Sequence, residues 1–384
     1  MKIDVMTKDK DIKTTVPTLR FREFQNDARW IPNKIDHVCK IGNGRDYKHL
    51  SAGNIPVYGS GGYMTSVDKF LYDGESVCIG RKGTIDKPIF LTGKFWTVDT
   101  LFYTYAFHKC LPKFLYLIFQ QINWYKYNEA GGVPSLLKTT IGNINIFIPN
   151  NENEQKKIVD CFSSLDDLIN AVADKIETLK EYKKGLMQQL FPAEGKTTPA
   201  FRLPEFQNKG EWEESTLGDI CDMQAGKFVS ASEICDVKKD TMYPCYGGNG
   251  LRGYTHSFTH FGIYPLIGRQ GAQCGNITYA EGKFHATEHA VVVTLKKDID
   301  IRWLYYQLIK LDLNQYATGQ AQPGLSVDVI KKVTIRIPKN KNEQQLIACG
   351  LFSVDELIST ETAKLDQLKA HKKGLMQQLF PKLQ

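Results

Sequence analysis

The sequence of 384 residues lacks the features that would assign it to several common classes of protein. It contains no run of 18 apolar residues, so no segment is expected to span a membrane. The first fifteen residues, MKIDVMTKDKDIKTT, are polar and hold no apolar signal core, so secretion is not expected. The nine cysteines are scattered and form no C-x-x-C pair, which predicts reduced thiols in a cytoplasmic protein.

Motifs for catalysis are missing as well. No Pro-Pro dipeptide occurs, which excludes the Asn/Asp-Pro-Pro-aromatic motif by which amino-methyltransferases hold an extruded base. Gly248–Gly253 fits G-x-G-x-x-G, but neither a helical pattern nor a suitable acidic residue follows it, so no dinucleotide site is expected. Two histidine pairs, His256 with His260 and His285 with His289, lack identifiable further metal ligands. We therefore expect no catalytic residue and no metal site.

The composition indicates a basic protein of more than one domain. A chain of 384 residues is long enough for two or three domains, each with its own core. The net charge of +7 is compatible with binding to nucleic acid, but many basic proteins bind none, so charge alone does not assign this function.

The most informative feature of the sequence is a duplication. The decamer KKGLMQQLFP occurs at Lys183–Pro192 and again at Lys372–Pro381. Three further motifs recur at offsets of 182, 188 and 189 residues. They are Pro17 to Trp30 with Pro199 to Trp212, Ile79–Gly83 with Ile267–Gly271, and Ile148 to Gln155 with Ile337 to Gln344. A period this long indicates a duplicated domain rather than a solenoid repeat, and loop insertions account for the drift in offset.

Each half ends in a segment with an apolar heptad pattern. The apolar residues alternate at spacings of four and three, which is the pattern of a coiled-coil seam, and Pro192 and Pro381 end the two segments. A helix packed only on its own globular block is the alternative, but five successive heptads favour pairing of the two helices. The expected seam residues are Ile158, Phe162, Leu165, Ile169, Val172, Ile176, Leu179, Leu186, Leu190, Ile347, Leu351, Val354, Ile358, Leu365, Leu368, Leu375 and Leu379.

Equivalent helices that end equivalent blocks pair most simply about a pseudo-twofold axis, which makes them antiparallel. Ile158 to Leu190 would span about 48 Å at ~1.5 Å per residue, which exceeds the roughly 34–36 Å between successive major-groove faces of B-DNA. Lys183, Lys372 and Glu361 interrupt the seam. Because buried charges are costly unless paired, these residues should set the register or face a further helix.

The blocks themselves predict a mixed fold of short strands ahead of one helix. Residues 75–99 alternate as hairpins would, and Pro112–Gln121 and Arg302–Ile309 are the expected helices. The predicted fold class is α+β, with two tandem mixed α/β blocks and two long antiparallel helices. The expected divisions are an N-terminal extension at 1–16, blocks at 17–150 and 199–339, helical segments at 151–192 and 340–384, and a linker at 193–198.

Three pairs of loops carry residues that could contact DNA. Arg81 and Arg269 lie in glycine-flanked turns after apolar strands, where long donors can approach phosphates or base edges, although a solvated hairpin tip would look the same. The glycine-rich turns near 58–63 and 246–252 and the polar loops at 131–138 and 318–324 are the others. The candidate DNA-binding residues are Tyr58, Ser60, Arg81, Lys82, Thr84, Lys138, Tyr246, Asn249, Arg252, Arg269, Gln270, Gln273, Gln320 and Gln322.

These features together resemble the specificity subunit of Type I restriction–modification systems, from Pro17 to Pro381. The resemblance rests on the duplicated block-plus-helix plan, the Ile-Gly-Arg-x-Gly turn, the Ile-Pro…Asn-Glu-Gln junction and the KKGLMQQLFP ends. It implies that the blocks are target-recognition domains, each reading one part of a gapped target in double-stranded DNA. The helices would act as a spacer and as the docking site for two methyltransferase subunits, and restriction–translocase subunits would complete the complex.

The resemblance also implies that this chain is not an enzyme. S-adenosylmethionine, ATP and magnesium would belong to the partner subunits, which methylate adenine N6 and cleave DNA. Because the loops differ between the blocks, the two half-sites should differ in sequence. Two other classes of function stay open at this point: a coiled-coil scaffold whose blocks bind protein, and a self-contained DNA methyltransferase or nuclease with an unrecognised site.

Overall fold

The computed structural model describes residues 15–271, 273–319 and 323–382, and its contacts divide the chain into two compact units. Unit 1 holds the described residues up to Val172 and from Lys364 onward, and unit 2 holds Ala173–Ala363. Each unit therefore combines one globular block with part of both long helices. We call the globular parts block 1 and block 2.

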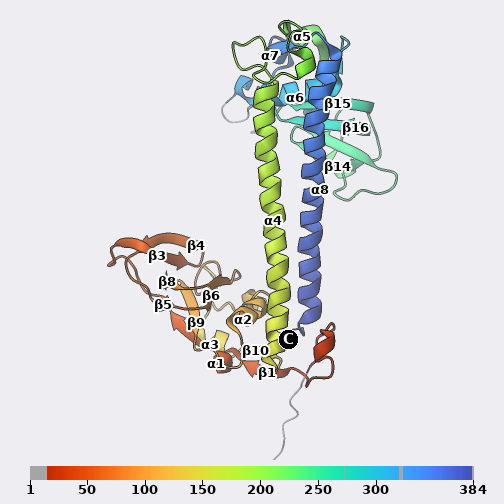
Figure 1. Ribbon diagram of the computed structural model, residues 1–384. Helices are drawn as coiled ribbons and strands as arrows, with labels where there is room; N and C mark the ends of the chain where they lie inside the picture. The colour runs from red at the N-terminus through yellow and green to blue at the C-terminus, as the bar shows by residue number, and fades with distance from the viewer. Residues whose placement is uncertain (1–14, 272, 320–322, 383–384) are drawn as a thin grey trace, which may run out of the picture. The chain divides into compact units, whose positions relative to one another are not determined.

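Block 1 is built from short helices and three small sheets. Its elements are η1 (Arg22–Phe24), β1 (Ile31–Lys34), α1 (Ile35–Val38), β2 (Lys40–Asn43), β3 (Ala52–Gly59), β4 (Gly62–Val67), β5 (Tyr72–Asp73), β6 (Ser76–Gly80), β7 (Ile89–Leu91), β8 (Lys94–Thr97), β9 (Leu101–Tyr105), α2 (Pro112–Phe119), η2 (Trp124–Tyr127), α3 (Lys138–Gly142) and β10 (Asn145–Ile148). The strand orders are β2-β9-β6-β7 and β4-β3-β8-β5, with β1 and β10 as a separate antiparallel pair (Figure 1).

Block 2 repeats this order with longer strands that join into one larger sheet. Its elements are η3 (Pro204–Phe206), β11 (Glu213–Thr216), α5 (Leu217–Ile220), β12 (Cys221–Ala225), η4 (Ala231–Glu233), β13 (Tyr243–Gly247), β14 (Gly250–Thr255), β15 (His260–Gly268), β16 (Ile277–Ala286), β17 (Ala290–Leu295), α6 (Ile301–Lys310), η5 (Leu313–Tyr316), α7 (Val327–Lys331) and β18 (Thr334–Ile337). The sheet runs β12-β17-β15-β16-β13-β14, and β11 pairs with β18. The two expected helices are confirmed as α2 and α6.

The hairpin expected within residues 75–99 is present, since β6 pairs antiparallel with β7, with Ser76 opposite Leu91. All five residues of β6 are nevertheless buried, so its burial does not alternate. Val77 and Ile79 belong to one apolar cluster and Cys78 to another, so both faces of the strand are covered. A strand buried on both faces lacks the period-two pattern of a half-buried strand.

The two long helices, α4 (Glu152–Leu190) and α8 (Lys341–Leu379), run side by side within each unit (Figure 1). Their pairing is antiparallel, because Lys372 contacts Asp166 in unit 1 and Lys183 contacts Asp355 in unit 2. Every expected seam residue is buried or half-buried. The predicted antiparallel pairing of the heptad segments is therefore confirmed.

The ends of the seam do more than join the helices to each other. Ile158, Phe162 and Leu379 belong to the core of block 1. Leu190, Ile347 and Leu351 belong to the main core of block 2. Each helix end is therefore part of a globular core, so packing on a block and pairing with the other helix occur together.

The three charged seam positions are all paired across the helices. Nζ of Lys183 lies 2.7 Å from the Asp355 carboxylate, and Lys372 meets Asp166 at the equivalent site 189 residues away. Glu361 accepts from Lys175 at 2.5 Å. These ion pairs offset the cost of placing charges in the seam, and they favour one antiparallel register because each lysine finds its carboxylate only there.

The start of each long helix is held by a buried clamp of three side chains. In unit 1, Arg20 donates two hydrogen bonds to the Glu154 carboxylate, at 2.8 and 2.7 Å, and Nε1 of Trp30 donates a third at 3.1 Å. Arg20 and Glu154 are 6% and 1% exposed. The hydrogen bond to Glu154 is the main cause that raises the pKa of Arg20. We call this triad the helix clamp.

Block 2 contains the same helix clamp. Arg202 donates to Glu343 at 2.7 and 2.8 Å, and Nε1 of Trp212 donates to the same carboxylate at 3.2 Å. The clamp explains two separate sequence repeats at once, because its arginine and tryptophan come from the repeat that starts at Pro17 or Pro199 and its glutamate from the Asn-Glu-Gln junction.

The repeated decamer supplies the other anchor. Phe380 packs against Trp30 and Phe114 at centroid distances of 5.9 and 5.3 Å, and Phe191 packs against Trp212 and Trp303 at 6.3 and 6.0 Å. The backbone amide of Leu19 donates to Gln378 O at 2.9 Å, as that of Phe201 does to Gln189 O. Each block thus binds the beginning of one long helix and the end of the other.

Removing the charge from one helix clamp should destabilise its unit strongly. Glu154→Gln keeps the shape of the side chain but leaves Arg20 buried without its counter-charge, a change that costs about 3–5 kcal/mol. Urea unfolding of the whole chain measures the loss. The matched control is Glu213→Gln, which removes an exposed pair with Lys339 and should cost less than about 1 kcal/mol. Equal losses for both variants would contradict a structural role for the clamp.

Candidate nucleic-acid interface

The candidate site of block 1 is organised by one turn, residues 97–101, between β8 and β9. The backbone amides of Arg45 and Arg81 donate to Thr97 O and Thr100 O at 2.8 Å each. The amide of Val98 donates to Tyr58 O at 2.9 Å. Three loops that are distant in sequence are thus bound to this segment, which we call the central turn.

Block 2 builds the same arrangement at residues 286–290. The amides of Lys227 and Arg269 donate to Ala286 O and His289 O at 2.9 and 3.0 Å, and the amide of Thr287 donates to Tyr246 O at 2.9 Å. The acceptors and donors on this turn are those of block 1 moved by 189 residues. The repeat therefore preserves a backbone scaffold.

A fourth loop closes the site in both blocks. Gly83 N donates to Pro134 O at 2.9 Å while Leu136 N donates to Arg81 O at 2.8 Å. In block 2, Gly271 N donates to Pro323 O and Leu325 N to Arg269 O, each at 2.9 Å. The three loop pairs that the sequence singled out therefore converge within each block.

The glycines of these loops are needed because backbone packs directly on backbone. An alanine β-carbon at Gly44 would lie 1.9 Å from the carbonyl oxygen of Val98 in the central turn, and one at Gly226 would lie 2.1 Å from that of Ala286. The glycine before each turn arginine has the same role, since a β-carbon at Gly80 or Gly268 would lie 1.9 or 1.8 Å from a carbonyl oxygen. These contacts exclude any side chain.

In block 1 the loops present cations beside two shallow recesses. Arg81 and Lys82 are exposed, and the Arg81 guanidinium donates to Asp99 O at 3.5 Å. One recess holds Arg81 and Lys82, and the second, which contains Ser60 and Lys48, shares Asp99 and Thr100 with it. The remaining candidates are placed as follows: Tyr58 is half-buried against Tyr63, Thr84 is half-buried behind Gly80, and Lys138 is exposed at the start of α3.

In block 2, Arg269 is half-buried, and its Nε is buried without a hydrogen-bond partner among the described residues. A buried donor of this kind costs free energy unless a ligand supplies the acceptor. Tyr246 packs edge-on against Phe284 at 5.7 Å, and burial is the main cause that raises the pKa of its hydroxyl. Asn249 accepts from Asn276 at 3.4 Å, and Arg252, Gln270 and Gln273 are exposed. Gln320 and Gln322 lie outside the described residues.

The sequence-based prediction missed a second cation in each block. Arg45 and Lys227 are exposed and are bound through their backbone amides to the central turns. A signal for them was present, because Gly44-Arg45 and Gly226-Lys227 are separated by the same 182 residues as the repeats that begin at Pro17 and Pro199. The prediction had considered three other pairs of loops and had not included the one that holds Arg45 and Lys227.

One histidine of each candidate pair, His260 and His285, makes contacts within block 2. Ring nitrogens of His285 contact Ser257 Oγ at 2.9 Å and Lys227 O at 3.1 Å, and His260 stacks on Phe284 at 5.5 Å. Among the described residues, no group of three or more His, Cys, Asp or Glu side chains is placed to hold a metal ion. No helix in the described part of the chain is long and apolar enough to cross a membrane.

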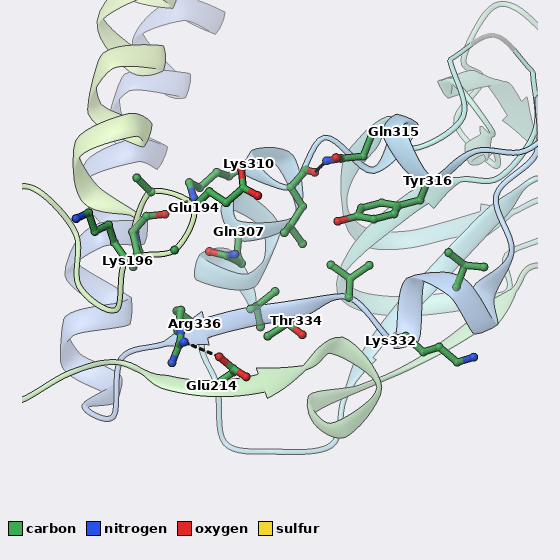
Figure 2. Close-up of a pocket in the computed structure, with 17 residues that line it drawn as sticks. Glu194, Lys196, Glu214, Gln307, Lys310, Gln315, Tyr316, Lys332, Thr334 and Arg336 are labelled. Atoms are coloured by element: carbon green, nitrogen blue, oxygen red, sulfur yellow. Dashed lines mark hydrogen bonds and ion pairs between the residues drawn. The ribbon is translucent and has the colours of Figure 1, made fainter.

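Another cavity has a volume of about 740 Å³. It is formed by residues 192–196 after α4, the end of α6 and the β11–β18 pair, and the ion pair between Arg336 and Glu214 lies at it (Figure 2). Burial lowers the pKa of Lys310, which donates to Pro192 O at its edge. None of the predicted DNA-binding residues lines this cavity, so it is separate from the candidate interface.

Both the sequence and the fold of the chain are similar to those of known proteins. The chain matches the family model described as the Type I restriction modification DNA specificity domain twice, over residues 28–181 and 209–370. It is 38% identical over 165 residues to the Type I restriction enzyme EcoprrI specificity subunit of Escherichia coli, a match that covers 43% of this chain and 41% of that relative. The similarity to the MjaVIII specificity subunit of Methanocaldococcus jannaschii is 27% over 346 residues, or 81% and 77% of the two chains.

Solved structures show the same fold. The S subunit of a Type I restriction–modification system from M. genitalium superposes with a TM-score of 0.73 at 18% identity, over 96% of this chain and 100% of that one. A chain from a study of complex assembly in a type I R-M system gives a TM-score of 0.50 at 14% identity, over 91% and 97%. At these identities the likeness establishes the architecture, and it confirms the predicted fold class.

Filling the space at the central turn should disrupt block 1 and its candidate site. Gly44→Ala places a methyl group 1.9 Å from the Val98 carbonyl oxygen, so the loop or the turn must move, at a cost of about 1–3 kcal/mol. Urea unfolding would report this loss. Gly61→Ala is the matched control, since no atom lies within 4 Å of its new methyl group and its stability should be unchanged. A neutral Gly44→Ala variant would show that the close approach is not required.

Proposed function

Since the chain belongs to the family of the Type I restriction modification DNA specificity domain, we propose that it is the DNA-recognition subunit of a Type I restriction–modification complex. In this proposal the chain carries no catalytic site and acts in the cytoplasm. The comparisons favour this function over the two alternatives, a protein-binding scaffold and a self-contained methyltransferase or nuclease.

The observation that carries the proposal is the repeated scaffold with different side chains. Both blocks fix four loops by backbone hydrogen bonds around a central turn, and both place a cation at two of them: Arg45 and Arg81 in block 1, and Lys227 and Arg269 in block 2. Arginine and lysine supply the phosphate contacts and the guanine contacts of DNA-binding proteins. A constant backbone with changeable tips suits two domains that perform the same task on different base sequences.

The residue that follows each of the two cations in the sequence differs between the blocks. Lys82 of block 1 corresponds to Gln270, and Asp46 corresponds to Phe228. Lysine favours guanine, glutamine favours adenine, and an acidic residue accepts from cytosine. We therefore propose that blocks 17–150 and 199–339 are two target-recognition domains that read different halves of a gapped target.

The long helices are proposed to set the gap and to bind the other subunits. Each helix has 39 residues, or about 58 Å at 1.5 Å per residue. We propose that the helical segments 151–192 and 340–384 dock two methyltransferase subunits, to which restriction–translocase subunits are added. S-adenosylmethionine, ATP and magnesium would be bound by those partners.

Selection of bound duplexes from a randomised pool, with the methyltransferase partner present, tests the proposed function directly. A gapped motif should be enriched. Arg81→Ala and Arg269→Ala should each relax the preference in one half of that motif and weaken binding by about 1–3 kcal/mol, if each arginine contacts guanine. Arg29→Ala, an exposed arginine beside Trp30 of the clamp, is the control and should leave the motif unchanged. Failure to enrich any gapped sequence would refute the proposal.

Lengthening the spacer should lengthen the gap. One heptad inserted at facing positions of α4 and α8 keeps the seam in register and adds about 10.5 Å, which corresponds to roughly three base pairs at ~3.4 Å each. Selection should return the two original half-sites with a longer gap. Seven residues inserted into the linker at 193–196 are the control, because that segment lies outside both helices. An unchanged gap in the helix variant would show that the helices are not the ruler.

A further inference from the structure

Block 2 carries one large apolar side chain that its own fold does not use. Phe228 is 76% exposed and lies on the loop between β12 and η4. Its backbone is nevertheless fixed: Lys227 N donates to Ala286 O at 2.9 Å on one side, and Val229, 5% exposed, is buried on the other. The position of this aromatic ring is therefore set by the fold although the ring itself is open to solvent.

The loop is held from a second direction by the histidine contact described above. His285 is 5% exposed, and its Nε2 lies 3.1 Å from Lys227 O while its Nδ1 lies 2.9 Å from Ser257 Oγ. Lys227 is thus bound to the central turn through its amide and to β16 through its carbonyl. These contacts explain why an imidazole is buried there, and their effect is to position Phe228.

Phe228 lies beside the proposed DNA-reading residues. Lys227, Tyr246 and Arg269 are each bonded to the central turn at residues 286–290, and Phe228 follows the first of them directly. The equivalent position in block 1 is Asp46, a charged residue on the rim of a recess. An exposed aromatic ring at this position is therefore specific to block 2, as a residue that determines specificity would be.

A phenyl ring has no hydrogen-bond donor or acceptor, so it can read DNA only through apolar groups. In the major groove the apolar group at the base edges is the 5-methyl group of thymine. We propose that Phe228 packs against a thymine methyl group in the half-site of block 2, an inference that rests on the proposed function. The Lys227 side chain would contact a phosphate. Because Phe228 is the next residue, its ring would then lie at the edge of the neighbouring base.

Replacing thymine by uracil tests this contact, because it removes the methyl group and leaves base pairing intact. The target is first selected with the wild-type chain in complex with its methyltransferase partner. Each thymine of both half-sites is then replaced singly, and affinities are measured for the wild type and for Phe228→Ala. At one position uracil should weaken wild-type binding about fourfold, the factor that one buried methylene contributes. The same replacement should have no effect on Phe228→Ala, and Phe228→Leu should restore part of the difference.

The control is Phe261→Ala. Phe261 is 69% exposed but lies seven residues, or about 23 Å of extended strand, from Gly268 at the site end of β15. This variant should keep the wild-type response at every thymine. A uracil penalty that persists in Phe228→Ala would overturn the proposal, as would a target without thymine in the half-site of block 2, which is the half-site that Arg269→Ala relaxes. Weaker binding by Phe228→Ala with no thymine dependence would also overturn it, since it would indicate a ring wedged between bases. Enrichment of the gapped motif by the wild type reports separately on the proposed function.

Discussion

The two buried glutamates at the start of the long helices are the contacts on which the architecture depends. Glu154 and Glu343 each accept hydrogen bonds from an arginine and a tryptophan of the adjacent block, in an environment where an unpaired carboxylate would be very costly. The clamp therefore ties the direction of each helix to the block from which it leaves. The phenylalanine at the end of the other helix, Phe380 or Phe191, packs against the same tryptophan. Each block therefore holds both helices at one tryptophan.

At the candidate interface, main-chain hydrogen bonds rather than side-chain contacts hold the loops together. Three loops bond to the central turn, a fourth bonds to one of those three, and glycines permit the close approach of the backbones. Side chains at the tips are then free to differ, as Asp46 and Phe228 do, without loss of a structural contact. In a fold of this kind the side chains at the loop tips can change while the main-chain scaffold stays the same.

The sequence predicted the long helices and their antiparallel pairing, and it singled out three pairs of loops, because each depended on a pattern present twice. That these loops converge became evident only from the fold. It did not predict that β6 is buried on both faces, since that depends on neighbours distant in the chain. It also missed the helix clamp, although Arg20, Trp30 and Glu154 all lay in recognised repeats. A repeat shows that residues matter, but only the fold shows which residues from separate repeats meet.

The duplication also separates structural from recognition residues on physical grounds. The polar residues of the clamp and of the lysine–aspartate pairs are the same in both units, because replacing one partner would leave a buried group unpaired. Apolar seam positions tolerate exchange, as Phe162 and its equivalent Leu351 show. Asp355 is instructive: it accepts from Lys183 as Asp166 does from Lys372, but in unit 2 it also accepts from Tyr306 at 2.7 Å. The repeated ion pair favours one register, and Asp355 makes the additional hydrogen bond while keeping that pair. Where no such partner exists, as at the exposed tips of the loops, the two blocks have diverged, and the difference between them is available for recognition.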